Sequence, residues 1–387
     1  MNSEKPRVLW VTNDLPPHSG GIQQFVANLL ARTADGTTLV LGPGVREAHM
    51  AEAAAFDARA PWRTERAKGR ILPTASTHRW VTRHVAEHRP DVVVLASVWP
   101  LGRIVPALKQ RFPVPVLGLS HGAEAGLAQS PMRRLLHAVT RDIDVVTVIS
   151  EHTSNALQPV LRDVRVERLS PGVHPSRFAR QQHCDEALRF RAQWNIPPGS
   201  PVVGCVARLV ARKGQDMLID VWSDVRALHP AAHLVLVGEG PRRRRLARRA
   251  RRVDGVHVVG RVGWEQLPAA YAALDVFAMP VRTRLGGLDV EGLGISLLEA
   301  QAAGLPVIAG DSGGAPETVR DPRCGTIVDG RDASDVVAAL DHWLRDAEAR
   351  HVARRLGPQQ AEAWSWDGVA LRFSSLLSEL AEQRRPD

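Results

Sequence analysis

The chain has 387 residues, of which 44% are hydrophobic and 24% charged, and this balance is typical of a folded globular protein. Its length exceeds what one ordinary hydrophobic core supports, so two domains are expected. Lys and Arg total 50 against 41 for Asp and Glu, a net charge of +9. That excess favours anionic partners such as nucleotide phosphates, phospholipid headgroups or nucleic acid, without choosing among them.

Several classes of protein are disfavoured by what the sequence lacks. No run of about 18 apolar residues occurs, and residues 1–7 are polar and lack the apolar core of a signal peptide, so a cytoplasmic location is expected. Cys184, Cys205 and Cys324 are isolated. This spacing predicts neither a disulfide framework nor a structural zinc site.

The first part of the chain alternates short apolar runs with longer helical patterns such as residues 22–32. The apolar runs are residues 8–12, 38–41, 91–96, 115–119 and 144–149. Because strands that alternate with helices form βαβ units, this pattern predicts an α/β domain around a parallel sheet.

A second series of apolar runs predicts a second doubly wound domain. Its members are residues 202–206, 233–237, 256–259, 275–279 and 306–309. The segment 170–200, rich in Pro and Gly, separates the two series and marks the boundary. Helical patterns follow at 332–344 and 361–380, and we expect the last helix to return to the first domain. The predicted domains are therefore residues 1–175 with 361–387, and residues 176–360.

Candidate ligand-binding residues of the first domain follow its strands, because ligands of open α/β sheets bind beyond the carboxyl ends of the strands. Gly20 and Gly21 precede a helix whose free N–H groups can meet an anion. Asp14 is a candidate for orienting an acceptor hydroxyl, and a turn-capping role fits it equally. His121, next to Gly122, ends another strand; a structural role for this histidine is the alternative.

In the second domain, Arg208 and Lys213 follow the strand at 202–206. A forked guanidinium and a point-like ammonium suit a diphosphate whose negative charge grows as it leaves. The alternative is a solvated basic turn.

The segment DVEGLGISLLEAQAAGLPV contains two glutamates, Glu291 and Glu299, in different local settings. The helix is expected to begin near Gly294, to bury Ile295, Leu298 and Ala302, and to stop at Gly304. Glu291 then precedes the helix while Glu299 lies on a neighbouring face, so the two carboxylates can face different parts of one ligand. Glu291 and the N–H groups after Gly292 can hold sugar hydroxyls, and Glu299 can accept hydrogen bonds from a ribose diol.

A further glycine pair, Gly313 and Gly314, precedes another expected helix and repeats the geometry that favours an anion.

Taken in order, these features resemble the family 4 retaining glycosyltransferases of GT-B fold. The segments VTNDLPPHSGGIQQF, ARLVARKGQD, RTRLGGLDVEGLG and AGDSGGAPETV are most similar to those of actinobacterial phosphatidylinositol mannoside mannosyltransferases of PimB type. The resemblance implies two Rossmann-like domains facing a cleft, GDP-mannose as donor, and a phosphatidylinositol (mono)mannoside as acceptor. It also implies that no metal and no cofactor are needed.

The resemblance also implies roles for individual residues. Arg208 and Lys213 would hold the donor diphosphate, Gly21 would approach it through the backbone, and Glu299 would bind the ribose. Glu291 and His121 would hold the transferred sugar. Retention would follow from front-face attack, with the leaving phosphate taking the proton of the acceptor hydroxyl.

Two arginine-rich segments bear on the partners. The run at 242–252 keeps Leu246 and Ala250 at helical spacing, so a solvated helix face is expected rather than a nucleic-acid-binding element. The segment PMRRLLHAVTR has an apolar stripe flanked by arginines, the pattern of an interfacial helix over anionic lipid, although an ordinary surface helix fits too. Its stripe consists of Met132, Leu135, Leu136 and Val139, and its arginines are Arg133, Arg134 and Arg141. A lipid acceptor favours peripheral contact with the inner face of the plasma membrane.

Three other functions remain open from the sequence. They are a nucleotide-sugar epimerase, a family 4 transferase with another donor and a soluble acceptor, and an arginine-driven nucleic-acid-binding protein. GDP-mannose follows from the resemblance alone, since guanine and uracil pockets both use backbone groups and apolar walls. The sequence contains no signal for an oligomeric state.

Overall fold

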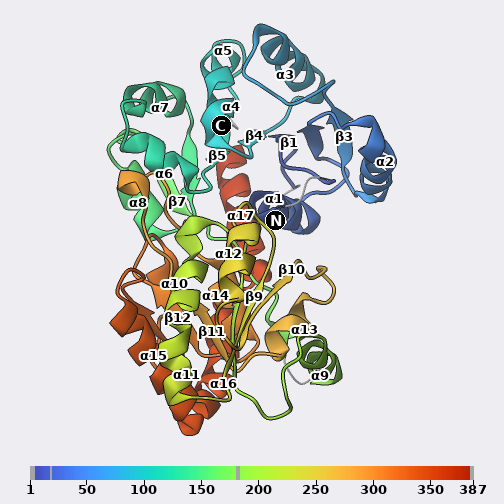
Figure 1. The fold of residues 1–387 in the computed structure, drawn as a ribbon. Coiled ribbons are helices and arrows are strands. Elements are labelled where there is room, and N and C mark those ends of the chain that lie inside the picture. The colour runs from blue at the N-terminus through green and yellow to red at the C-terminus, as the bar shows by residue number, and fades with distance from the viewer. Residues whose placement is uncertain (1–4, 18–19, 180–183, 384–387) are drawn as a thin grey trace. The chain divides into compact units, whose positions relative to one another are not determined.

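The computed structural model describes residues 5–17, 20–179 and 184–383, which form two compact units (Figure 1). Unit 1 comprises Met1–Pro171 and Trp366–Asp387, and unit 2 comprises Gly172–Ser365. Both boundaries lie a few residues from the expected positions at 175 and 361. The physical reason is that the two connecting segments pair with each other inside unit 2, where the N–H of Val173 donates to the carbonyl of Trp364 at 2.9 Å.

Unit 1 is built on a parallel sheet of seven strands in the order β3-β2-β1-β4-β5-β6-β7. The strands are β1 (Val8–Val11), β2 (Leu39–Gly42), β3 (Arg63–Arg66), β4 (Val92–Leu95), β5 (Val116–Leu119), β6 (Val145–Val148) and β7 (Arg165–Arg168). The five inner strands are fully buried and correspond to the five apolar runs of the sequence. The edge strands β3 and β7 were not predicted, because their sequences, RTER and RVER, are charged and half-exposed.

The helices of unit 1 cover both faces of this sheet (Figure 1). They are α1 (Gly21–Thr33), α2 (Met50–Arg59), α3 (Ala75–His88), α4 (Val98–Leu101), α5 (Val105–Lys109), α6 (Ala123–Ala128), α7 (Arg133–Thr140), α8 (Glu151–Leu157) and α17 (Trp366–Glu382). The last helix belongs to this unit, as the sequence predicted. The ring of Phe373 lies 5.4 Å from Trp10 of β1, and that of Trp366 lies 5.7 Å from Phe25 of α1.

Unit 2 has a six-stranded parallel sheet in the order β10-β9-β8-β11-β12-β13. Its strands are β8 (Val202–Val206), β9 (His233–Val237), β10 (Val256–Gly260), β11 (Val276–Met279), β12 (Val307–Gly310) and β13 (Gly325–Val328). The first five match the second series of apolar runs. β13 was not predicted, since this short edge strand begins at a glycine and has two residues in its middle that are not buried.

The helices of unit 2 differ from the prediction near the chain's end. They are α9 (Cys184–Gln193), α10 (Gln215–Asp220), α11 (Trp222–Leu228), α12 (Arg243–Ala250), α13 (Leu267–Ala272), α14 (Ile295–Ala302), α15 (Ala333–Arg345) and α16 (Ala347–Glu362). The expected helix 361–380 begins only at Trp366, because residue 361 still belongs to α16, which ends at Glu362. That helix tolerates Gly357 and Pro358, and Gly357 is needed where α16 meets α14: a Cβ there would lie 2.7 Å from the Gln301 carbonyl oxygen.

Two local predictions in unit 2 were also wrong. The glycine pair at 313–314 is followed by a single 3-10 turn, η7 (Ala315–Thr318), rather than by a helix. In α14 the buried residues include Leu297 and Ala300 as well as Leu298 and Ala302, whereas Ile295 is only partly buried. The helix is therefore covered on more than one side. In the described part of the chain, no helix combines the length and the apolar composition needed to cross a bilayer.

Candidate active site

Arg208 lies two residues after β8, and its side chain is exposed to solvent. This side chain makes no hydrogen bond or ion pair with any of the described residues. Its backbone is held, because the side-chain amide of Gln215 donates to the Arg208 carbonyl at 3.2 Å. An arginine that is anchored at its backbone and free at its guanidinium is available to an anionic ligand.

Lys213 lies in the same turn but is buried, with 8% of its surface exposed. It ends the 3-10 turn η5 (Ala211–Lys213), and Gly214 follows with a φ of 75°. A Cβ at Gly214 would lie 2.1 Å from the Pro280 carbonyl oxygen, so this turn packs directly against the end of β11. The ammonium of Lys213 is thereby delivered to Glu291, where Nζ lies 2.8 Å from Oε2.

Glu291 is the buried acceptor of two cations. Nε of Arg212 lies 3.2 Å from the same Oε2 that contacts Lys213. Burial disfavours the charged form, but the positive charges of Lys213 and Arg212 outweigh it and hold the pKa of Glu291 below its ordinary value. Glu291 is therefore a carboxylate at neutral pH.

The backbone of Glu291 is positioned by the glycine pair that follows β12. The N–H of Gly314 donates to the Glu291 carbonyl at 3.0 Å. Gly313 has a φ of 64°, and a Cβ there would lie only 1.9 Å from that carbonyl oxygen. The sequence assigned these glycines to an anion-binding turn, whereas in unit 2 they pack against the loop that carries the glutamate.

Glu299 lies in α14 and accepts a hydrogen bond from the hydroxyl of Tyr271, on α13, at 2.6 Å. Burial raises the pKa of Glu299 to about 7, although the Tyr271 hydrogen bond and the charges of Lys213 and Arg177 act in the opposite direction. Lys213 forms an ion pair with Glu291 and also acts electrostatically on Glu299, so these three side chains lie in one region of unit 2. Glu299 is thus poised near neutrality, where a ligand can shift it to the carboxylate.

The loop between β11 and α14 is held by hydrogen bonds of residues that the sequence did not indicate. The backbones of Arg284 and Asp289 exchange two hydrogen bonds, at 2.9 and 3.2 Å, and the guanidinium of Arg212 reaches Asp289 Oδ1 at 3.3 Å. The loop ends at Gly292, which is partly exposed, and Gly294, which has a φ of 91° and caps α14 without a side-chain hydrogen bond. The position of Arg212 beside Lys213 was the only available signal for its role.

In unit 1, Gly20 and Gly21 lie at the start of α1, which has no side-chain cap. A Cβ at Gly20 would meet the Gln23 amide at 2.4 Å, whereas one at Gly21 would meet nothing within 4 Å. Asp14 accepts a hydrogen bond from Gln23 Nε2 at 2.5 Å, and its own N–H donates to Thr12 Oγ1 at 2.8 Å. Asp14 is thus joined to the first turn of α1 by a side-chain hydrogen bond, and its role stays a prediction. The space next to Gly21 is open within unit 1.

His121 lies at the carboxyl end of β5 with its ring held in place. Nε2 lies 2.5 Å from the carbonyl oxygen of Ala96, and the ring packs edge-on against Phe25 with 5.5 Å between centroids. Because Nε2–H donates to this carbonyl, Nδ1 is the ring nitrogen left for a ligand. Buried Glu124, which the sequence reasoning missed, accepts from the N–H of His121 at 3.3 Å and from the Ser120 hydroxyl at 3.0 Å.

The predicted residues therefore form two groups, each at the carboxyl edge of its own sheet. Unit 2 brings together Arg208, Lys213, Glu291 and Glu299, with Gly292 and Gly294 beside them, and unit 1 holds Gly20, Gly21, His121 and Asp14. Over the described ranges, no three His, Cys, Asp or Glu side chains are grouped to hold a metal ion.

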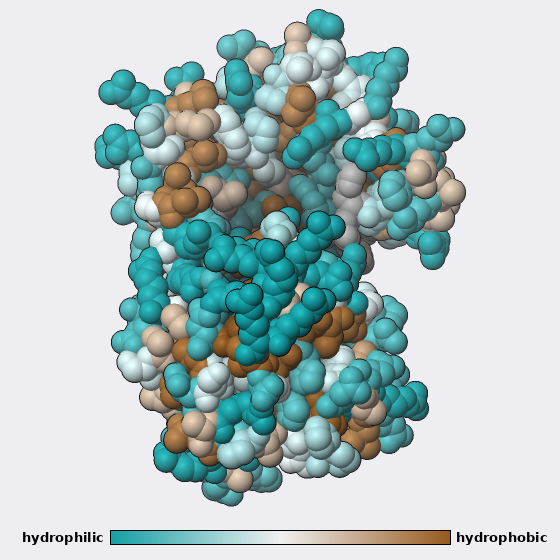
Figure 2. All heavy atoms as spheres, viewed as in Figure 1, coloured by the Kyte–Doolittle hydropathy of each residue, from teal (hydrophilic) through white to brown (hydrophobic). Residues whose placement is uncertain are grey.

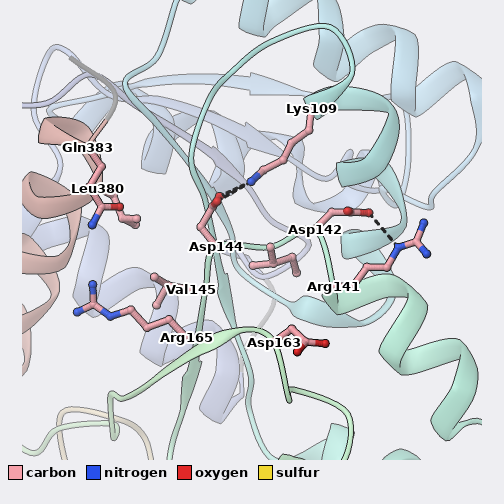
Figure 3. Close-up of a pocket in the computed structure, with 10 residues that line it drawn as sticks. Lys109, Arg141, Asp142, Asp144, Val145, Asp163, Arg165, Leu380 and Gln383 are labelled. Carbon is pink, nitrogen blue, oxygen red and sulfur yellow. Dashed lines mark hydrogen bonds and ion pairs between the residues drawn. The ribbon is translucent and has the colours of Figure 1, made fainter. Parts of the chain in front are cut away.

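A cavity of about 490 Å³ in unit 1 lies at the opposite end of the strands (Figure 3). It is bordered by Asp144, directly before β6, and by Arg165, the first residue of β7. Most of its charged side chains are paired with one another or with neighbours: Lys109 Nζ lies 2.6 Å from both oxygens of Asp144, and Arg165 binds Glu167 and Glu379. This cavity does not contain the candidate site.

Comparison with known families covers both units. The family described as "Glycosyltransferase Family 4" matches residues 19–177, and that described as "Glycosyl transferases group 1" matches residues 187–360. The chain is 38% identical to the "GDP-mannose-dependent alpha-(1-6)-phosphatidylinositol monomannoside mannosyltransferase" of Mycobacterium tuberculosis, over 96% of this chain and 98% of that protein. It is 37% identical to the monoacylated-acceptor counterpart of Corynebacterium glutamicum, over 97% and 98% of the two chains.

Solved structures agree on the fold at lower identity. Sucrose-phosphate synthase from Thermosynechococcus elongatus matches with a TM-score of 0.75 and 21% identity, over 96% of this chain and 98% of that one. A glycosyltransferase from Rickettsia africae matches with a TM-score of 0.78 and 14% identity, over 98% and 99%. These matches, together with the two doubly wound parallel sheets, confirm the predicted GT-B class of fold.

Proposed function

The chain belongs to the family 4 glycosyltransferases, and we propose that it moves mannose from GDP-mannose to a phosphatidylinositol monomannoside with retention of configuration. The match to GDP-mannose-dependent mannosyltransferases, at 37% to 38% identity, extends over nearly the whole chain, so the matched region spans both candidate groups. The observation that carries the proposal is the buried Lys213–Glu291 pair beside the free guanidinium of Arg208 and the carboxyl of Glu299.

The donor diphosphate is assigned to Arg208 and Lys213. Without ligand, Lys213 shares the Glu291 carboxylate with Arg212, so its ammonium is held in place before the donor arrives. Charge builds on the diphosphate as the bond from its oxygen to the sugar C1 breaks. A fixed cation in a site shielded from water stabilises that charge at no reorganisation cost. These two cations supply the charge that a divalent ion provides elsewhere, and we therefore expect transfer without added metal.

The donor ribose is assigned to Glu299. Tyr271 binds Oε2, which orients the carboxyl group and leaves Oε1 to accept from a diol. Each hydrogen bond to a carboxylate contributes roughly 1.5 to 3 kcal/mol. Glu291, fixed by its backbone and its two cations, is assigned to the hydroxyls of the transferred sugar.

We assign two contributions to unit 1, which are open space for the donor and one ring nitrogen that accepts a hydrogen bond. The open space next to Gly21 lets the donor approach the backbone, and Nδ1 of His121 accepts from a hydroxyl of the sugar. In the transfer step the acceptor oxygen forms its bond to C1 on the face from which the phosphate leaves. The acceptor proton passes to the leaving phosphate oxygen, so that no protein base is needed.

The lipid acceptor calls for peripheral contact with an anionic membrane, which we assign to α7. Leu136 and Val139 anchor this helix in the core of unit 1, whereas Met132 and Leu135 are 38% and 41% exposed. The exposed part of the predicted stripe, with Arg133, Arg134 and Arg141 around it, has the composition of an interfacial helix. We place the enzyme at the inner face of the plasma membrane, where GDP-mannose is available.

A donor screen followed by product analysis tests this function. We expect calorimetry to detect GDP-mannose binding to the full chain, with UDP-glucose much weaker, and mass spectrometry to detect one hexose added to phosphatidylinositol monomannoside in mixed micelles. Tight binding of UDP-glucose with transfer to a soluble acceptor would establish the alternative transferase. Conversion of the nucleotide-sugar without any acceptor would establish an epimerase.

A further inference from the structure

Helix α12 carries a strongly cationic surface that the proposed transfer does not use. The helix packs on unit 2 through Leu246 and Ala250, which are 1% and 6% exposed. Its remaining positions are almost all arginine, and Figure 2 shows hydrophilic side chains gathered over this helix. The solvated face expected from the sequence is therefore present.

Three arginines in or directly before this helix form ion pairs. Arg242 lies 3.6 Å from Asp216, Arg243 lies 3.3 Å from Glu239, and Arg249 forms an ion pair with Asp220. The other five make no hydrogen bond, ion pair or ring contact with any residue that the structure describes, and all five are exposed. We call them the α12 face: Arg244, Arg245, Arg248, Arg251 and Arg252.

The α12 face points away from the anchoring residues. At 100° per residue, Arg244, Arg245 and Arg248 fall within an arc of about 100° that lies almost opposite the midpoint between the two buried residues. Arg251 and Arg252 follow in the turn directly after the helix. Five like charges so close together in the chain repel one another, and none of them forms an ion pair with a described residue. Such an arrangement favours an external surface that carries many negative charges.

We propose that the α12 face docks unit 2 on a membrane surface rich in anionic phospholipid. The inference rests on the proposed function, because a lipid acceptor brings the enzyme to such a surface. Guanidinium groups bind phosphate through paired hydrogen bonds, and a cluster of four to eight Lys or Arg is typical of sites for anionic headgroups. The segment 241–252 contains no aromatic residue with which to stack bases, which disfavours single-stranded nucleic acid.

Asp216 links the start of α12 to the donor loop. Its Oδ2 accepts from Arg282 at 2.6 Å and lies 3.6 Å from Arg242. Arg282 begins the loop that leads to Glu291. Docking through the α12 face would therefore hold the donor-binding edge of unit 2 near the surface on which the acceptor resides.

Vesicle sedimentation of the full chain tests the docking surface. The variant R244Q/R245Q/R248Q is compared with wild type on phosphatidylinositol-containing and on pure phosphatidylcholine vesicles. Because each exposed cation strengthens binding about fivefold, we expect the variant to bind the anionic vesicles roughly 100-fold more weakly. High salt should weaken wild-type binding. The charge-preserving R244K/R245K/R248K should retain binding and controls for folding.

The matched control is R323Q/R345Q/R355Q, which removes the same net charge from exposed positions elsewhere in unit 2. It should bind anionic vesicles nearly as wild type does. Equal losses in both triple variants would show a general effect of net charge and overturn the proposal, as would unchanged binding of R244Q/R245Q/R248Q. Duplex DNA binding tighter than vesicle binding, and lost in that variant alone, would assign the face to nucleic acid instead.

The proposed function is tested separately on the same variants. GDP-mannose binding by calorimetry and transfer to acceptor in detergent micelles should match wild type in R244Q/R245Q/R248Q, since neither needs a vesicle surface. Absence of transfer in the wild type would overturn the proposed function, whereas the vesicle comparison alone decides the docking surface.

Discussion

The residues at the carboxyl edges of the two sheets differ in charge and in burial. In unit 2 the edge concentrates charge: Lys213 and Glu291 are buried against each other, and Glu299 has its pKa raised by burial. In unit 1 the edge consists of exposed glycines and of side chains tied to neutral groups, such as the ring of His121 against the Ala96 carbonyl. Under the proposed function, unit 2 would supply the electrostatics of transfer and unit 1 would supply space and orientation.

Removal of Lys213 should have the largest effect. Lys213→Ala takes away a preorganised cation at the leaving diphosphate and leaves Glu291 with Arg212 alone. We expect kcat to fall by roughly 100- to 1000-fold, or about 2.7 to 4 kcal/mol of barrier. Steady-state kinetics with saturating GDP-mannose measure it, and Arg323→Ala, on the surface of unit 2, is the control. Turnover near that of wild type would show that the charge of unit 2 is not catalytic.

A bulky side chain at Gly21 tests whether the donor needs the open space next to this residue of unit 1. Gly21→Val introduces a side chain where a Cβ meets nothing within 4 Å, so unit 1 should keep its thermal unfolding temperature. The donor should be displaced, and a misplacement of about 1 Å costs on the order of 100-fold in kcat/KM. Thermal unfolding and kinetics of the same preparation separate the two effects. Unchanged kcat/KM would mean that the donor does not approach this backbone.

The exposed arginines of α7 test whether the surface of unit 1 binds anionic membranes. Arg133→Gln with Arg134→Gln should weaken binding to phosphatidylinositol-containing vesicles roughly 30-fold, at about 1 kcal/mol for each charge. Transfer to acceptor in detergent micelles should be unaffected. Sedimentation detects the loss, and equal binding by wild type and variant would assign α7 to an ordinary surface helix.

The pH dependence of donor binding should report Glu299 with the smallest effect. Its folded pKa, about 7, lies above the unfolded value, so its contribution to stability is present below the unfolded pKa and lost as the pH rises through about 7. A donor that requires the carboxylate should therefore bind roughly fivefold more tightly at pH 7 than at pH 6, and the affinity should level off above pH 8. Calorimetry of wild type and Glu299→Gln tests this, since the variant should lose the dependence. The same dependence in both proteins would exclude Glu299 as its source.

The sequence predicted the buried parts of the fold better than its edges. Fully buried strands such as β1 and β8 read as continuous apolar runs, whereas the edge strands β3 and β7 carry charged residues and leave no such signal. Helix α16 was missed because Gly357 and Pro358 are typical helix breakers, and only its close packing on α14 explains the glycine.

The candidate site shows the same division. Residues that follow strands, such as Arg208 and His121, could be placed from the sequence, because the carboxyl edge of a parallel sheet gathers them. Tyr271 and Glu124 could not, since each acts through a contact with another side chain or backbone group rather than through a position after a strand. The pairing of Glu291 with Arg212 and Lys213 likewise depends on the path of a loop that no periodic pattern describes.

The most direct test of the account is the transfer itself, measured with full-length wild type and Lys213→Ala side by side. GDP-mannose is supplied in solution and phosphatidylinositol monomannoside in anionic vesicles. The product is analysed by mass spectrometry and by NMR of the new anomeric centre. We predict one added mannose in the α configuration for the wild type, formed equally well after exhaustive EDTA treatment, and almost none for the variant. A β-configured product, loss of transfer with EDTA that Mg²⁺ restores, or equal turnover by the two proteins would contradict the account.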